Sequence, residues 1–124
     1  MPGMFEDISR AVRDRGYAEP AEVKHVAAFA EQSESPIAFA MVGDLIQLLD
    51  DCDDYDLSDA ESAYLRAVAI DPTYFEGYAS LGYFYDAVMH DPESARSFFE
   101  KAVELGDESA EEGLQAALDQ IHRA

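Results

Sequence analysis

A short pattern of residues occurs three times in the chain, at an interval typical of helical repeats. Each copy begins with a large apolar residue and continues, three, four and seven positions later, with an apolar, a small and another apolar residue. The copies are Phe5-x-x-Ile8-Ser9-x-x-Val12, Phe39-x-x-Val42-Gly43-x-x-Ile46 and Tyr78-x-x-Leu81-Gly82-x-x-Tyr85. They begin at residues 5, 39 and 78, at intervals of 34 and 39 residues. A period of this length predicts a stacked array of helical units, an architecture that usually presents a binding surface.

A second pattern follows each copy of the first, with alanine, a bulky residue four positions later and alanine three positions after that. Its copies are Ala21-x-x-x-His25-x-x-Ala28, Ala60-x-x-x-Tyr64-x-x-Ala67 and Ala95-x-x-x-Phe99-x-x-Ala102. Glycine inside a helix costs about 1 kcal/mol relative to alanine, and this cost is tolerable where a neighbouring helix must approach closely. We therefore expect the small residues of both patterns to face each other within helix pairs, with the bulky rings beside them.

Helical periodicity and helix breakers predict seven helices and no strand. The fourth helix is expected to begin with a capping box formed by Ser58 and Glu61. Asp91 should cap the sixth helix, with Pro92 at its first position, and Gly106 should end it. The predicted helices cover about residues 4–15, 20–33, 36–49, 58–71, 74–89, 92–106 and 108–122.

Together the two patterns resemble the tetratricopeptide repeat family, whose units carry an aromatic residue, Leu-Gly and Tyr on one helix and Ala, Phe and Ala on the next. The copies in the third pair match best, whereas the first pair departs with Ser9 in place of Gly and His25 in place of the aromatic residue. The resemblance implies an all-α, antiparallel helix-hairpin solenoid of three tetratricopeptide-like repeats plus a C-terminal capping helix. It would form a single domain over residues 1–124, with repeats at about 2–35, 36–74 and 75–109 and a cap at 110–124. The alternative is an ordinary helical bundle whose core is rich in alanine and tyrosine.

In this family the first helix of each pair lines a concave groove that holds ligands. The resemblance therefore implies a partner-binding groove that mixes acids, two arginines and a tyrosine. The residues concerned are Glu6, Arg10, Arg13, Asp44, Gln47, Glu76, Tyr83 and Asp86. The Lys and Asn residues that bind a terminal carboxylate in some members are absent, so a basic or mixed-charge peptide or helix fits better. The alternatives are a merely solvated face and, for Tyr83, simple packing rather than a binding hot spot.

The formal net charge is −19, from 27 acidic and 8 basic residues. Such a surface repels nucleic acid and anionic lipid and attracts cationic partners. We therefore expect a non-catalytic protein–protein interaction module whose partner is basic or mixed in charge, with no nucleic acid and no membrane. The alternative is an acidic inhibitor or immunity-type protein that neutralises a basic toxin or nuclease. The charge is also compatible with solubility alone, or with adaptation to a salty cytoplasm.

The acidic stretch between the third and fourth predicted helices has the spacing of a calcium loop at four positions, Asp50, Asp54, Ser58 and Glu61. It is a weak candidate, because the third position is Cys52 and the sixth, where glycine is needed, is Tyr55. A solvated insertion or contact loop is the alternative. No zinc spacing, phosphate loop or nucleophile motif is recognisable, so we expect neither an enzyme nor a cofactor.

A single cysteine allows no internal disulfide, which fits a reducing cytoplasm. No secretory signal is visible, and no apolar run approaches the ~18 residues of a membrane span. We therefore expect a cytoplasmic location. The oligomeric state is left open.

Overall fold

The chain is helical throughout the part that the structure describes. The structure is a computed structural model and describes residues 3–50 and 54–123. Within these ranges lie seven α-helices, α1 (Met4–Arg15), α2 (Pro20–Ser33), α3 (Pro36–Gln47), α4 (Leu57–Ile70), α5 (Phe75–Tyr83), α6 (Pro92–Glu104) and α7 (Ala110–Arg123). A π-helical segment, η1 (Phe84–Val88), continues α5. The same ranges contain no strand, only an isolated parallel bridge between Ala18 and Leu49. The expectation of an all-α fold is confirmed.

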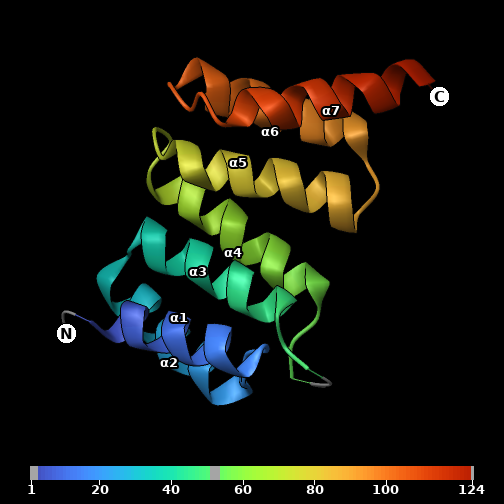
Figure 1. Ribbon diagram of the computed structural model, residues 1–124. Coiled ribbons are helices and arrows are strands. Elements are labelled where there is room, and N and C mark those ends of the chain that lie inside the picture. Colours follow the sequence, from blue (N-terminus) through green and yellow to red (C-terminus); the bar gives the residue numbers. More distant parts are fainter. Residues whose placement is uncertain (1–2, 51–53, 124) are drawn as a thin grey trace.

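The helices form a stack in which, from α2 onward, each packs mainly against its neighbours in sequence (Figure 1). The pair α1–α2 lies at one end of the stack, α3–α4 follows, and α6 and α7 lie at the other end. The closest backbone approaches are those of α3 with α4, α5 with α6, and α6 with α7. None of the helices in the described part of the chain combines the length and apolar character that crossing a membrane requires.

The starts of α2, α3 and α6 agree with the predicted start signals. Pro20, Pro36 and Pro92 stand in the first turn of their helices, where proline costs no hydrogen bond. Asp91 caps α6 by accepting a hydrogen bond from the Ser94 amide at 3.2 Å. These predicted starts are confirmed because each depends on a single residue with a strong local preference.

The start of α4 differs from the prediction. Its capping box is formed by Asp56 and Asp59, each of which accepts a hydrogen bond from the backbone amide of the other. Ser58 lies inside the first turn and donates its hydroxyl to Asp56 at 2.6 Å. The predicted box of Ser58 and Glu61 is therefore wrong. A carboxylate at the N-cap also interacts favourably with the positive end of the helix dipole, which favours Asp56 over the neutral Ser58.

The predicted helix over residues 74–89 is not uniform. Its α-helical part ends at Tyr83, and the backbone then widens into η1. Two consecutive aromatic residues of η1 pack on different neighbours: buried Phe84 contacts Tyr64 of α4, and Tyr85 stacks on Phe98 of α6 with ring centroids 5.4 Å apart. The Tyr85 hydroxyl also donates a hydrogen bond to Glu61 of α4. The π segment thus joins α4, α5 and α6.

Glycine–ring contacts join the two helices of the second pair, α3–α4, and the two helices of the third pair, α5–α6. A Cβ atom at Gly43 of α3 would lie 2.6 Å from the ring of Tyr64 on α4, and one at Gly82 of α5 would lie 2.6 Å from the ring of Phe99 on α6. A Cβ atom at Gly113 of α7 would likewise lie 2.5 Å from the ring of Phe99. Only glycine permits such approaches. The predicted close approach at the glycines is found in these two pairs, but the side chain that meets each glycine is a ring, where we expected an alanine with the rings beside it.

The first pair packs differently. The three residues of its second pattern, Ala21, His25 and Ala28, are all exposed, and so is Ser9. Helix α2 instead buries a different face, made of Val23, Val26 and Ala30. The expectation that Ala21 faces α1 is therefore wrong, because burying two valines removes more apolar surface from water than burying alanines beside a histidine.

Helix α7 covers the far end of the stack with one apolar side. Ala110, Gly113 and Ala117 are buried, Leu114, Leu118 and Ile121 are half-buried, and Glu111, Glu112 and Asp119 are exposed. Helix α7 thus has one apolar and one charged side.

Candidate functional site

Three hollows lie next to one another on the side of the molecule formed by α1, α3 and α5. The first, of about 340 Å³, lies along α1, and the second, of about 420 Å³, lies between α1 and α3. The third, of about 230 Å³, lies between α3 and α5 with its η1 continuation. Ser9 and Arg13 line both the first and the second hollow, and Asp44 lines both the second and the third. The hollows therefore form a continuous surface.

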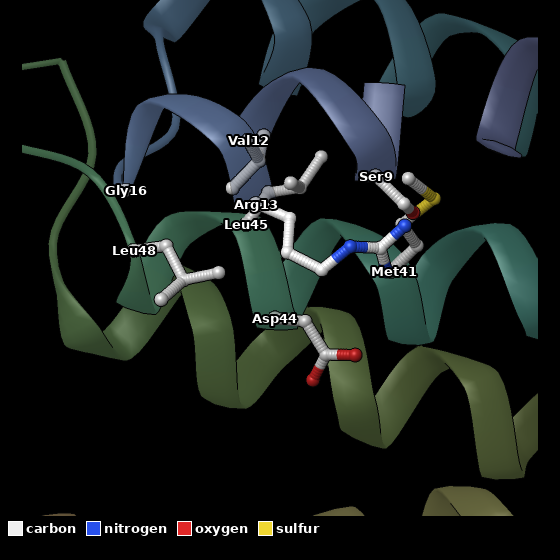
Figure 2. Close-up of a pocket in the computed structure, with 8 residues that line it drawn as sticks. All are labelled: Ser9, Val12, Arg13, Gly16, Met41, Asp44, Leu45 and Leu48. Atoms are coloured by element: carbon white, nitrogen blue, oxygen red, sulfur yellow. The ribbon is translucent and has the colours of Figure 1, made fainter. Parts of the chain in front are cut away.

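The hollow between α1 and α3 is the largest of the three and is mainly apolar. Its walls are Ser9, Val12, Arg13, Gly16, Met41, Asp44, Leu45 and Leu48 (Figure 2). Figure 2 shows the Arg13 side chain extended from α1 across the hollow toward α3. Leu48 is 48% exposed, so part of this apolar side chain is open to solvent. The hollow offers a contact surface for an apolar group between one basic and one acidic side chain.

Four residues of this hollow form one stripe on α3. Met41, Asp44 and Leu45 lie on α3 and Leu48 is its C-cap residue; each is three or four positions from two of the others, so they share a helix face. The prediction from family resemblance included only Asp44 of this stripe. The three apolar neighbours were recognisable in the sequence by the same spacing, but a buried stripe and a binding stripe have the same pattern.

Asp44 is held in place by a hydrogen-bonded group at the junction of two hollows. The Tyr64 hydroxyl donates to Asp44 Oδ1 at 2.5 Å, and Gln47 Nε2 donates to the Tyr64 hydroxyl oxygen at 2.7 Å. Asp44 is exposed as a residue, yet desolvation of its carboxylate by the surrounding side chains raises its pKa, and the hydrogen bond from Tyr64 lowers it in part. Burial, together with the negative charge of Asp44, also raises the pKa of Tyr64. Tyr64 was expected only as a core residue; its hydroxyl reaches the surface because its ring lies on Gly43.

Tyr83 combines packing with accessibility. Its ring meets Phe99 edge-on, with centroids 4.8 Å apart and an interplanar angle of 79°. The residue is nevertheless 49% exposed and lines the hollow between α3 and α5 together with Gln47. The structure thus shows both packing and exposure at Tyr83, and its role as a binding hot spot stays a prediction.

The other predicted groove residues divide into two groups. Glu6 and Arg10 line the hollow along α1, and Arg10 lies 3.8 Å from Asp7 in an exposed ion pair. Asp86 instead accepts a hydrogen bond from Gln120 of α7 at 2.6 Å, and Glu76 is exposed in the first turn of α5, outside the three hollows. Six of the eight predicted residues thus line the connected hollows, namely Glu6, Arg10, Arg13, Asp44, Gln47 and Tyr83.

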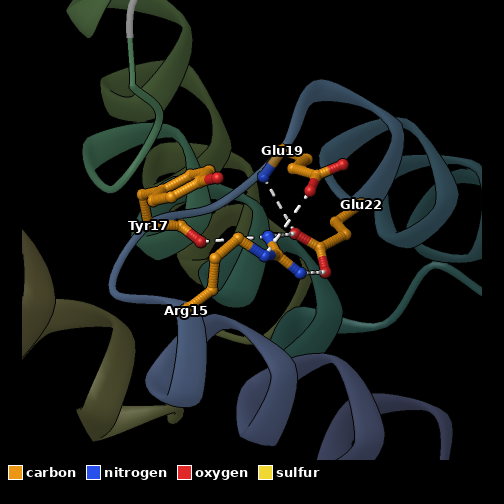
Figure 3. Close-up of polar contacts among 4 residues, drawn as sticks. All are labelled: Arg15, Tyr17, Glu19 and Glu22. Carbon is orange, nitrogen blue, oxygen red and sulfur yellow. Dashed lines mark hydrogen bonds and ion pairs between the residues drawn. The ribbon is translucent and has the colours of Figure 1, made fainter.

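A polar cluster that the sequence reasoning missed joins α1 to α2 (Figure 3). The Arg15 guanidinium donates to both carboxylate oxygens of Glu22, at 2.8 and 2.9 Å, and to the Tyr17 carbonyl oxygen at 3.0 Å. Glu22 also accepts the Glu19 amide at 2.8 Å. Hydrogen bonding from Arg15 lowers the pKa of Glu22. The sequence did contain a signal for this cluster, because opposite charges, Arg15 and Glu22, stand on the two sides of the turn at Gly16. The cluster orients the first helix pair and leaves no free group for chemistry.

Three of the four residues of the candidate calcium loop have other contacts. Glu61 accepts from Tyr85, Ser58 donates to Asp56, and Asp54 lies 3.8 Å from Lys24. The loop position of Cys52 lies outside the described residues. Across residues 3–50 and 54–123, no group of three or more His, Cys, Asp or Glu side chains is arranged to hold a metal ion.

Comparison of the chain with protein-family models, with curated proteins and with solved structures finds no match. The interpretation of the connected hollows therefore depends on the residues that line them.

Proposed function

We propose that the protein is a tetratricopeptide-like module that binds a segment of another protein along its α1, α3 and α5 side, without catalysis. In this proposal α1–α2, α3–α4 and α5–α6 are three repeats, and α7 is the cap. The observation that carries the proposal is the continuity of the three hollows through Arg13 and Asp44. A continuous surface of this kind suits an extended or helical segment better than it suits a small molecule.

Two further observations support the assignment. The glycine–ring contact recurs with the same geometry in α3–α4 and α5–α6, at Gly43 with Tyr64 and at Gly82 with Phe99, as stacked units of one kind require. The surface also carries an exposed aromatic residue, Tyr83, and an exposed leucine, Leu48. Aromatic residues are enriched at binding hot spots, so we propose that Tyr83 contacts the partner.

The test is capture of partners from the native host with a Tyr83→Ala/Arg13→Ala double variant. We expect the folded double variant to lose the partner that the natural chain retains. A matched control is Leu65→Ala/Arg123→Ala, which removes an exposed apolar residue of α4 and an exposed arginine of α7 outside the three hollows. The groove assignment is wrong if the first variant keeps every partner, or if both variants lose them equally.

The net charge of −19 favours a second candidate, an acidic inhibitor that neutralises a basic toxin or nuclease. Long-range attraction would then steer the inhibitor to a cationic active site and raise the association rate. The association rate should fall steeply as salt is raised from low to physiological concentration, because exposed charges are screened beyond about 10 Å. A rate that does not change with salt would exclude this candidate.

A further inference from the structure

Asp44 joins the hollow between α1 and α3 to the hollow between α3 and α5, because it forms part of the wall of both. Its carboxylate accepts a hydrogen bond from the Tyr64 hydroxyl at 2.5 Å. Tyr64 is only 1% exposed, and its hydroxyl oxygen accepts a hydrogen bond from Gln47 at 2.7 Å. A carboxylate that a packed ring holds in one orientation is better prepared for recognition than one on a freely rotating surface side chain.

Asp44 has no ion pair within the described part of the chain. Arg13 lines the same hollow, yet it too forms no ion pair there. Next to Asp44 the lining of the hollow is apolar, from Val12, Met41 and Leu45. Asp44 is exposed, so a cation can reach it from solvent, and an ion pair formed beside this apolar wall is screened less by water than one on an open surface. The chain's excess of negative charge also concentrates cations near its surface.

We propose that Asp44 binds the cationic side chain of a lysine or arginine in the partner, and that an adjacent large apolar side chain of the same partner fills the hollow between α1 and α3. This inference rests on the proposed function and specifies the chemistry of its partner. The volume of about 420 Å³ lies within the range of sites that hold a ligand group of that size. Arg13 on the opposite wall repels a second cation, so the basic group is directed to the Asp44 side of the hollow.

The proposal can be tested with a small probe that combines the two features, the phenethylammonium ion. In a titration followed by amide NMR, we expect the probe to shift the signals of residues 12–13 and 41–48. The Asp44→Asn variant keeps an oxygen acceptor for Tyr64 but lacks the negative charge, and it should raise the Kd for the probe about tenfold. The matched control, Glu76→Gln, removes the same charge from an exposed position outside the hollows and should change the Kd less than about twofold.

Two further probes, one uncharged and one with a negative charge, complete the test. 2-Phenylethanol and 3-phenylpropanoate share the ring but lack the cation, and both should bind more weakly than phenethylammonium. Equal binding of the three probes, or equal effects of Asp44→Asn and Glu76→Gln, would overturn the assignment of Asp44.

The outcome is separable from that of the proposed function. If Asp44→Asn leaves probe binding unchanged while the Tyr83→Ala/Arg13→Ala variant still loses the partner, the cation site is wrong and the groove stands. If the double variant keeps every partner, the groove itself is wrong, whatever the probe does.

Discussion

The first helix pair and the two pairs that follow it are joined by different kinds of contact. In α3–α4 and α5–α6, a ring from the second helix lies directly on a glycine of the first, so the close fit of shapes joins the helices. Helices α1 and α2 are joined by two other contacts. Phe5 meets Phe29 edge-on with ring centroids 5.3 Å apart, and Arg15 forms a bidentate ion pair with Glu22. Similar spacing in the sequence thus produces one contact that depends on shape and another that depends on charge. The two kinds should respond to different perturbations.

The largest expected effect tests whether the aromatic positions of the three pairs are equivalent. Phe99→Ala should lower the free energy of unfolding by about 3–5 kcal/mol, because it leaves a cavity where a fully buried ring touched two glycines. His25→Ala, at the position that corresponds in sequence, should change it by less than about 0.5 kcal/mol, because His25 is exposed. Urea unfolding measures both. Losses of similar size would contradict the difference between the pairs.

A smaller effect tests the glycines themselves. Gly82→Ala should lower the free energy of unfolding by about 2 kcal/mol, because overpacking of about 3 kcal/mol exceeds the gain in helix propensity of about 1 kcal/mol. The ring of Phe99 has little room to move, since Gly113 lies on it as well. The control is Ser9→Ala, at the corresponding exposed position of α1, which we expect to be nearly neutral. A Gly82→Ala protein as stable as the natural chain would show that the ring can shift.

The smallest effects concern pH and should have opposite signs in the two regions. Arg15 lowers the pKa of Glu22, so this pair contributes stability above the ordinary glutamate pKa of about 4.3, and the contribution is lost as the pH falls through the lowered value. Glu22→Gln should therefore be less stable than the natural chain at pH 7. The difference should shrink in acid, as measured by urea unfolding over a series of pH values.

For Asp44 the sign reverses. Desolvation of its carboxylate raises its pKa, so its ionised form lowers stability above that pKa, and the cost disappears as the pH falls toward the ordinary aspartate value of about 3.9. Asp44→Asn should be more stable than the natural chain at pH 7, and this difference should also shrink in acid. A destabilised Asp44→Asn protein at pH 7 would mean that the charge of Asp44, rather than its acceptor oxygen, holds Tyr64.

Helix starts that depend on a single residue could be predicted from the sequence. Pro20, Pro36, Pro92 and Asp91 each act within one turn, so the helix starts they predict are found. The start of α4 was missed because Asp56 stands among so many acids that several pairs fit a capping box.

Features that depend on the angle between helices were not predictable. Helix α2 offers two faces, one with alanines and His25 and one with valines, and spacing alone does not decide which is buried. The hydroxyl of Tyr64 reaches Asp44 only because Gly43 admits the ring to that depth, which requires knowledge of the packed pair. The hollow between α1 and α3 likewise results from packing, although its stripe on α3 was visible in the sequence.

The ring of Phe99, enclosed by Gly82 and Gly113, joins three helices through a single side chain. Helix α7 can separate from the stack only by uncovering this ring, so α5, α6 and α7 should open and close together as one cooperative unit. The pair α1–α2 has no such shared anchor and should exchange its amide hydrogens through separate, less costly openings. Local stability would then increase along the chain from α1 to α7. The largest of the three hollows, between α1 and α3, lies toward this less stable end, so its width should vary more than that of the hollow between α3 and α5.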